Sequence, residues 1–290
     1  MKTKCLLMII LLTAIVACRK TYTNQPGSGP VNPPPPPPPP PSVIFDTSSV
    51  RLKDLTARNL PSPYYHFAYN DSGYITDAVF ASGLRIYGIE YEKKRILRMF
   101  NNTFANKDVI EYKYVNGELI AIEVSDQAGF LIRKCFVTFS AEHKLQKLEW
   151  QVMGGLVLIP EQTFELQYYA DGNLETLTTR TLAVGPQLEG TSIDKFENYD
   201  NKKNVDGFTL LHPSQMQHLV LLPSSGMQLN NPRRQIHTGS GANTLMYTIN
   251  YNYIYDAAGR PLVKTGDLLF TGGANNGQHF ETQETFSYYD

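Results

Sequence analysis

A repeated tyrosine-and-turn pattern constrains the fold of this chain more than any other feature. Each copy reads aromatic, any residue, Tyr, a short turn that often contains Gly, and then aliphatic residues spaced by two or three. The copies lie around Tyr69, Tyr91, Tyr114, Phe139, Tyr168 and Tyr255. The successive intervals between the first four copies are 22, 23 and 25 residues. The chain ends on a similar segment, Phe286–Asp290. A period of this length indicates one structural unit used repeatedly.

Each copy predicts a β-hairpin. Asn116–Gly117 and Asp171–Gly172 mark tight turns, because Gly accepts the positive φ that such turns need. Apolar and polar residues alternate along the flanking segments, most clearly over Tyr247–Tyr255, as on strands with one covered face. We therefore expect an all-β fold, an antiparallel meander of about 12–14 strands whose sheet curls or closes partly or wholly into a barrel, because closure removes exposed edges.

One long insertion, at about residues 200–243, interrupts the repeat. Within it, Pro213–Leu222 predicts one short helix, because Pro suits the first helical position and apolar residues recur on one side. Asn230–Gln235 and Gly239–Asn243 are rich in turn-forming residues and predict loops.

The amino-terminal residues predict a leader followed by a lipid anchor. Residues 1–17 hold two lysines and then an apolar run too short to cross a bilayer, which is typical of a secretory signal. The run ends in Ile15, Val16 and Ala17 before Cys18, and this resembles a bacterial lipobox. The resemblance implies that the leader is removed and that Cys18 carries lipid, an anchor that is stable with two or more chains. An ordinary signal peptide, or an anchor that is never cut, is the alternative.

The segment after Cys18 predicts a spacer. Residues 18–45 contain polar residues, Gly and an unbroken proline run, Pro33–Pro41. Proline fixes φ and lacks an N–H, so the run predicts a polyproline rod of about 28 Å. We expect residues 46–290 to form one β-domain, which the spacer would hold off a membrane.

Composition excludes some functions. Loss of the two leader lysines moves the formal net charge from −1 to about −3, which is not the balance of a nucleic-acid-binding protein. With Cys5 in the leader and Cys18 lipidated, Cys135 has no partner for an intrachain disulfide. Cys135 lies in a strand-like run and is expected to be packed rather than reactive.

Two segments resemble known families. Tyr251–Lys264 resembles the YD repeat of Rhs-type proteins, with Tyr255 and Asp256 at motif positions. Phe196–Gly207, followed by Asn230–Pro232, resembles a family of Gram-negative lipoproteins described as a domain of unknown function with a porin-like fold. The resemblance implies that fold and a lipoprotein; it carries no activity and no catalytic residues.

The search for chemistry gives only weak candidates. The sequence contains no G-x-S-x-G, H-E-x-x-H, P-loop or C-x-x-C motif, and we expect no catalytic residue, metal or cofactor. Tyrosine rows beside Asn and Gln are expected to pack against each other across strands rather than to bind sugars. The weak candidates for ligand binding lie in the insertion: Asp200, Asn204, Asp206, His212, His218, Arg233 and Arg234.

Three functions remain open. The sequence favours a non-enzymatic lipoprotein of the cell envelope, a binding or structural β-domain at the outer membrane, on its periplasmic face or on the cell surface. Its partners would be the membrane, through lipid on Cys18, and a glycan, a peptide or an envelope protein, but not nucleic acid. The alternative is a hydrolase of glycans or peptides with its site at the mouth of the β-domain, near the insertion. A transmembrane barrel is a third reading, against which the charges of Glu90–Arg98 count.

Overall fold

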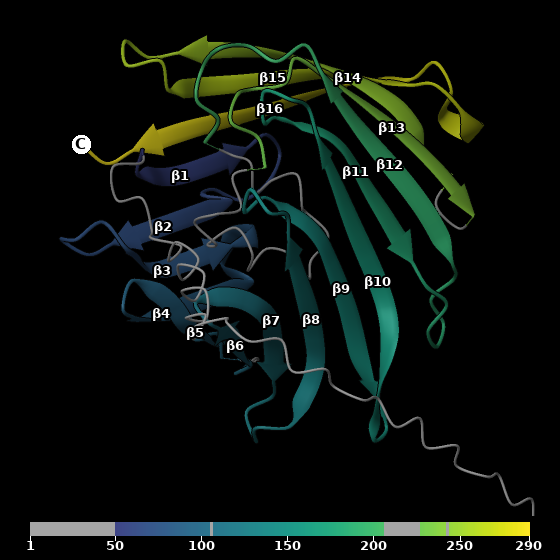
Figure 1. Cartoon of the computed structure of the whole chain (residues 1–290). Coiled ribbons are helices and arrows are strands. Elements are labelled where there is room, and N and C mark those ends of the chain that lie inside the picture. The colour runs from purple at the N-terminus through teal and green to yellow at the C-terminus, as the bar shows by residue number, and fades with distance from the viewer. Residues whose placement is uncertain (1–49, 105–106, 206–226, 242–243) are drawn as a thin grey trace, which may run out of the picture. The chain divides into compact units, whose positions relative to one another are not determined.

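A computed structural model describes residues 50–104, 107–205, 227–241 and 244–290 (Figure 1). The chain divides into two units, residues 1–38 and 39–290, and all described residues belong to the second. The predicted helix Pro213–Leu222, Cys18 and the proline run lie outside the described residues. In the described part of the chain, no helix is long and apolar enough to cross a membrane.

The described residues form sixteen strands and two short 3₁₀ turns, Ala81–Gly83 and Gly273–Asn275. The strands are β1 (Leu52–Ala57), β2 (Tyr65–Tyr69), β3 (Ile75–Phe80), β4 (Arg85–Glu92), β5 (Arg95–Asn101), β6 (Val109–Val115), β7 (Glu118–Ser125), β8 (Leu131–Phe139), β9 (Leu145–Gly154), β10 (Val157–Tyr168), β11 (Leu174–Thr181), β12 (Gly190–Glu197), β13 (Arg234–Gly241), β14 (Met246–Tyr255), β15 (Pro261–Phe270) and β16 (His279–Tyr288).

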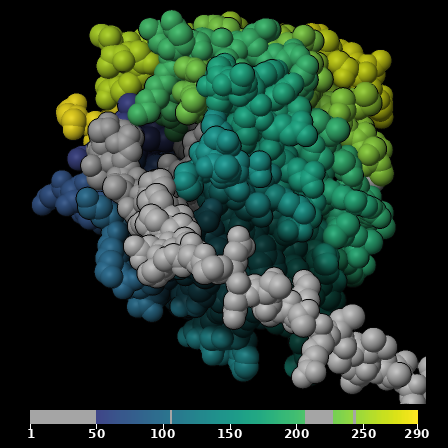
Figure 2. All heavy atoms as spheres, viewed as in Figure 1, coloured from purple at the N-terminus to yellow at the C-terminus, as the bar shows by residue number. Residues whose placement is uncertain are grey.

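The strands close into an antiparallel barrel. Each strand pairs with the next along the chain, and β16 pairs with β1. Figure 2 shows the tightly packed outer wall in the same view. The predicted all-β meander is therefore confirmed, with closure complete and with sixteen strands instead of about twelve to fourteen.

One source of the difference is β13. Its residues fall partly in Asn230–Gln235 and Gly239–Asn243, which the sequence assigns to loops. Pairing with β12 over Gly190–Glu197 and with β14 over Met246–Asn250 makes this Gly-rich segment a strand. Contacts with two neighbouring strands thus override the local preference for turns.

The two faces of the wall differ. Buried apolar side chains line much of the interior, among them Trp150, Tyr87, Phe80 and Phe164. Cys135 is among them as a free thiol, as expected, and burial raises its pKa well above the ordinary value.

Charged pairs cover the outward face. Arg98 and Glu90 lie opposite each other on β5 and β4, with Nε and Oε2 2.7 Å apart. Lys134 and Glu123 form the equivalent pair on β8 and β7, with Nζ and Oε1 2.8 Å apart. On β4, β5, β7 and β8, the alternation therefore places these charged pairs outside and most apolar groups inside.

Tyrosine hydroxyls link consecutive hairpins at one end of the barrel. Tyr69 on β2 donates to the carbonyl of Leu52, the first residue of β1, at 2.9 Å. Tyr91 on β4 donates to the carbonyl of Ile75, the first residue of β3, also at 2.9 Å. The contact recurs for Tyr114 with Ile96, Tyr168 with Leu145, Tyr199 with Leu174 and Tyr288 with Pro261. We call these contacts the tyrosine latches.

The latches form a series around the barrel. Tyr91 pairs with Ile96 across its own hairpin, and the Ile96 carbonyl then accepts the Tyr114 hydroxyl at 3.1 Å. Tyr288 likewise pairs with Leu52, so the series crosses the closure between β16 and β1. The hydroxyls that form the latches therefore bind backbone, in agreement with packing rather than with a sugar platform.

The connections alternate between two ends of the barrel. The turns that follow β2, β4, β6, β8, β10 and β14 lie at the latched end, where the chain also enters β1. The connections that follow odd-numbered strands lie at the opposite end, which we call the rim. In Figure 1, the β2–β3 turn of the latched end lies at the left and the β9–β10 turn of the rim at the lower right.

Candidate functional site

The two described ends of the insertion meet in a polar neck at the latched end. Residues 198–205 follow β12, residues 227–233 precede β13, and Lys203 pairs with Asn230 between them. Asn204 donates its backbone N–H to the carbonyl of Leu229 at 3.0 Å and its side-chain amide to Oε1 of Gln228 at 3.2 Å. Asn204 therefore joins the two segments.

Asp200 is the buried acceptor of this neck. Its Oδ1 accepts the backbone N–H groups of Lys202 at 2.9 Å and of Asn231 at 3.2 Å. Its Oδ2 accepts the Tyr255 hydroxyl, and Nη2 of Arg233 lies 3.8 Å away. Burial, and then the Asp200 carboxylate, raise the pKa of Tyr255 well above its ordinary value.

The neck is also fastened to a hairpin turn. Asn173, in the β10–β11 turn, is almost fully buried. Its Oδ1 accepts the backbone N–H groups of Leu229 at 3.0 Å and Asn230 at 2.9 Å, and its amide donates to Asp171 at 3.1 Å. The structure therefore uses these Asn and Asp side chains to hold the base of the insertion.

The predicted ligand residues divide into two groups. Asp200, Asn204 and Arg233 lie together in the neck, where Asp200 and Asn204 make the contacts above. Arg234 begins β13 and pairs outward with Glu197 at 3.4 Å. The remaining three, Asp206, His212 and His218, lie outside the described residues.

A basic pocket of about 300 Å³ lies beside the neck. It is lined by Lys202, Lys203 and the β14–β15 turn at Ala257–Arg260, and by Val205. The turn is closed by Asp256, which accepts Arg260 Nε at 2.6 Å, and this contact lowers the pKa of the carboxyl.

A second polar group lies on the inner face of β12, β13 and β14. Nδ1 of His237 lies 2.7 Å from Oδ1 of Asp194, and both side chains are largely buried. The imidazole stacks on Tyr247, with ring centroids 4.5 Å apart and planes 5° apart. Gln235 donates to Asp194 at 2.8 Å and accepts the Tyr251 hydroxyl at 2.6 Å. We call this group the inner polar cluster.

The cluster extends to β15 and β16. The Lys264 ammonium lies 4.9 Å from the centroid of the Tyr251 ring and 3.2 Å from Oε2 of Glu284. Ion pairs in a largely buried position are strong only when both groups are well bonded. Here the ring and the carboxylate together hold the ammonium against the inner wall.

The chemistry available to the cluster is that of a base. Asp194 fixes the orientation of His237 through Nδ1, as a carboxylate does for a catalytic histidine. Nε2 of His237 has no hydroxyl or thiol bonded to it among the described residues. The described cluster thus has a base and its orienting carboxylate, without the nucleophile of a triad.

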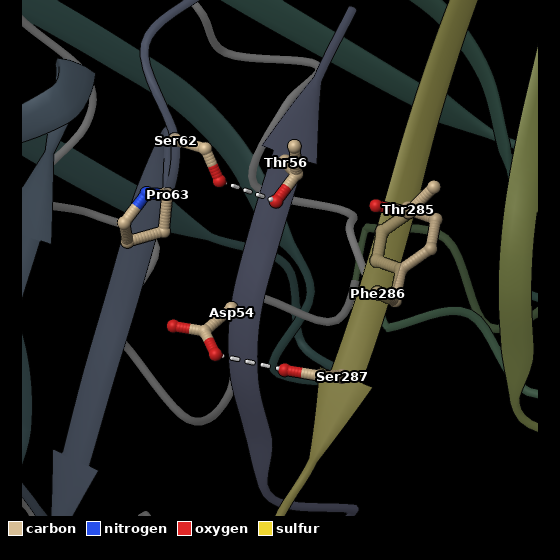
Figure 3. A pocket seen from close by; sticks show the side chains of 7 residues that line it. All are labelled: Asp54, Thr56, Ser62, Pro63, Thr285, Phe286 and Ser287. Carbon is tan, nitrogen blue, oxygen red and sulfur yellow. Dashed lines mark hydrogen bonds between the residues drawn. The ribbon is translucent and has the colours of Figure 1, made fainter.

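A third polar site lies on the outward side between β1, β2 and β16 (Figure 3). It is a pocket of about 330 Å³ lined by Asp54, Thr56, Ser62, Pro63, Thr285, Phe286 and Ser287. Asp54 accepts the Ser287 hydroxyl at 2.9 Å, and its other oxygen lies 2.7 Å from Nδ1 of His66. Because the carboxylate stands between serine and histidine, the histidine cannot activate this serine.

Sequence reasoning missed the His–Asp pairs, including an exposed third one in which Nδ1 of His279 lies 3.2 Å from Oδ1 of Asp267. His237 lies between the two segments that the sequence predicts as loops, whereas the structure places it on β13 with its side chain facing the interior. The signal that could have found it is the alternation of Gln235 and His237 with outward residues. Asp194 gives no such signal, because it reaches His237 only through the pairing of β12 with β13, 43 residues later in the chain. In the described part of the chain, no group of three or more His, Cys, Asp or Glu is arranged to hold a metal ion.

Comparison with known proteins shows the fold. A porin-like protein from Bacteroides uniformis matches with a TM-score of 0.55 and 14% identity, over 86% of this chain and 98% of that one. A porin-like protein from Bacteroides vulgatus matches with a TM-score of 0.54 and 10% identity, over 82% of this chain and 99% of that one. No family model and no curated protein matches the sequence. The chain is therefore an all-β meander closed into a sixteen-stranded barrel, similar in fold to these porin-like proteins.

Proposed function

We propose that this chain is a lipid-anchored protein of the cell envelope, whose barrel does not cross the membrane and serves as a non-enzymatic binding or structural domain. The observation that carries the proposal is the distribution of charge across the wall. Lys113–Glu111 and Lys147–Glu149 add outward pairs, at 2.8 and 3.0 Å, to those on β4–β8. A barrel that faces lipid has an apolar outer band, which these paired charges on the outer face would interrupt. The leader and Cys18 in turn support an anchor outside the barrel.

Fractionation of cells tests the anchor and the barrel together. Full-length chain with Cys18 should pellet with membranes, carry acyl groups on residue 18, and be released by detergent. The Cys18→Ala chain should lose the acyl groups and no longer behave as an integral protein after carbonate extraction. A Cys18→Ala barrel that stays embedded, with strands protected from protease, would contradict a barrel that does not cross the membrane.

The binding role needs a separate test. Full-length protein in detergent should be screened against glycan and peptide arrays, with the inner polar cluster and the outward pocket at Asp54 as the candidate sites. Specific binding that falls at least tenfold in Asp194→Asn or Asp54→Asn would assign the site. Binding unchanged in both variants would place the ligand elsewhere.

The buried pair of His237 and Asp194 favours one alternative, a hydrolase acting on glycans or peptides. Asp194 positions the imidazole at 2.7 Å, as a general base requires. Incubation with the same panel should release no product if the domain only binds. Product release that is lost in His237→Gln, with folding unchanged by circular dichroism, would establish the enzyme instead.

A further inference from the structure

The rim and the latched end of the barrel differ in composition. Turns at the latched end are polar, such as Lys93–Lys94 and Asn116–Gly117. At the rim, by contrast, large apolar side chains project into solvent. Six Leu and Phe side chains among them are more than half exposed: Leu84, Phe104, Phe130, Leu156, Leu188 and Phe280.

These residues are spread evenly around the barrel. The first five lie one each in the connections after β3, β5, β7, β9 and β11, and Phe280 lies at the start of β16, just after the eighth connection. Leu60 and Leu245 occupy the two other connections and are 46% and 49% exposed. Every connection at this end therefore contains an exposed Leu or Phe or is directly followed by one. We call the whole set the apolar rim.

Exposure at the tips is nearly complete. The exposed fractions of Phe104 and Leu156 are 102% and 100%, so these side chains touch almost nothing in the described barrel. Single exposed apolar residues are ordinary on a protein surface. Eight exposed Leu and Phe residues at one end of a barrel, with few at the other end, form a group instead. The arrangement indicates a surface that covers this end.

We propose that the apolar rim docks on a lipid bilayer. Because each connection spans two strands, neighbouring tips lie roughly 10 Å apart, with wall between them. A rigid protein partner would need a separate, matched pocket for each tip. A fluid bilayer admits each side chain individually, and Leu and Phe partition favourably into it. Spacing and side-chain type therefore both fit lipid.

The length of chain before β1 permits the rim to face the membrane that holds the anchor. This step rests on the proposed anchor at Cys18, which would bring a membrane within reach. The chain enters β1 at Leu52, at the end opposite the rim. About 30 residues separate Cys18 from Leu52, and their fully extended span is roughly 100 Å. The longest strand, β10, has 12 residues and a length of about 40 Å. The anchor can therefore lie in the membrane on which the rim docks.

Fluorescence quenching by brominated lipids tests the proposal on the full chain. Leu156→Trp places a probe on the rim, and Val115→Trp places the matched probe beside the turn at the latched end, where Val115 is 52% exposed. The native Trp150 is buried in the barrel and gives the same background in both. In phosphatidylethanolamine–phosphatidylglycerol vesicles, brominated acyl chains should lower the added Leu156→Trp emission at least twofold and leave Val115→Trp nearly unchanged.

A variant with a less apolar rim, and a check for dimers that would cover the rim, complete the test. Adding Phe104→Ser and Phe130→Ser to Leu156→Trp should restore most of the emission, and their exposure leaves folding intact by circular dichroism. Equal quenching of the two probes would overturn the proposal. So would an unquenched Leu156→Trp in a chain that dimerises through Phe104 and Phe130, because a second copy would then cover the rim. The mass of residue 18 reports the anchor separately: an unacylated Cys18 refutes the anchor, whereas the difference between the two probes reports the rim.

Discussion

At the scale of single residues, the tyrosine hydroxyl is the group on which the repeat depends. Tyr91 donates to the Ile75 carbonyl at 2.9 Å, and its removal leaves a part-buried carbonyl without this donor. We predict that Tyr91→Phe lowers the free energy of unfolding by about 1–2 kcal/mol, measured by urea denaturation. Tyr289→Phe is the control, because its hydroxyl has no bonded partner in the described chain. Equal losses in the two variants would show that the latch contributes nothing specific.

The series of latches also has a gap at residue 139. Phe139 ends β8 at the position where other hairpins have the latching tyrosine, and the carbonyl in register is that of Leu119, which pairs with Tyr114. We predict that Phe139→Tyr raises the free energy of unfolding by about 0.5–1.5 kcal/mol, because the added hydroxyl completes the series. Phe136→Tyr, on the exposed face of the same strand, should change it by much less. A loss of stability in Phe139→Tyr would show that the carbonyl is not accessible to the new group.

At the scale of elements, the neck fixes the base of the insertion to the β10–β11 turn. Asn173 accepts two backbone N–H groups, those of Leu229 and Asn230. We predict that Asn173→Ala speeds hydrogen exchange of these two amides at least tenfold, because the only side-chain acceptor recorded for them among the described residues is removed. Asn250→Ala, on the exposed face of β14, should leave both rates unchanged. Unchanged exchange in Asn173→Ala would mean that the neck is held by other contacts.

At the scale of the whole molecule, the buried tyrosines make the barrel sensitive to alkali. Burial raises the pKa of Tyr114 to about 12 and raises those of Tyr91, Tyr168 and Tyr199 well above the ordinary value. Unfolded tyrosines lose their protons near pH 10, whereas these folded ones keep them. Since the unfolded chain then binds fewer protons, stability is complete below about pH 10 and falls as pH rises.

Thermal unfolding followed by circular dichroism checks this pH dependence. The melting temperature should be level from pH 8 to about 9.5 and should fall above pH 10. The fall should be shallower in Tyr91→Phe, because that variant has one such group fewer. A melting temperature that stays level to pH 12 would contradict the proposed coupling.

The sequence predicts the local units of this fold well. Turn residues such as Asn116–Gly117 and the alternation of Tyr247–Tyr255 correctly identify hairpins, because both signals act between residues close in the chain. The assignment of both ends of β13 to loops failed because this strand depends on pairing with β12 and β14. Of the weak ligand candidates, Asp200, Asn204 and Arg233 do lie together in the neck, and a ligand at these residues stays a prediction.

The sequence by itself determined the all-β class, the hairpin repeat and the packed state of Cys135, since each follows from residue type and short-range spacing. Tertiary structure alone decided that sixteen strands close completely, that Asp194 meets His237 inside, and that Leu84 and Phe104 share one rim with Leu156. The physical reason is that these outcomes depend on which strands pair and at which end each connection lies. Such relations join residues tens to more than two hundred positions apart, and no local pattern specifies them.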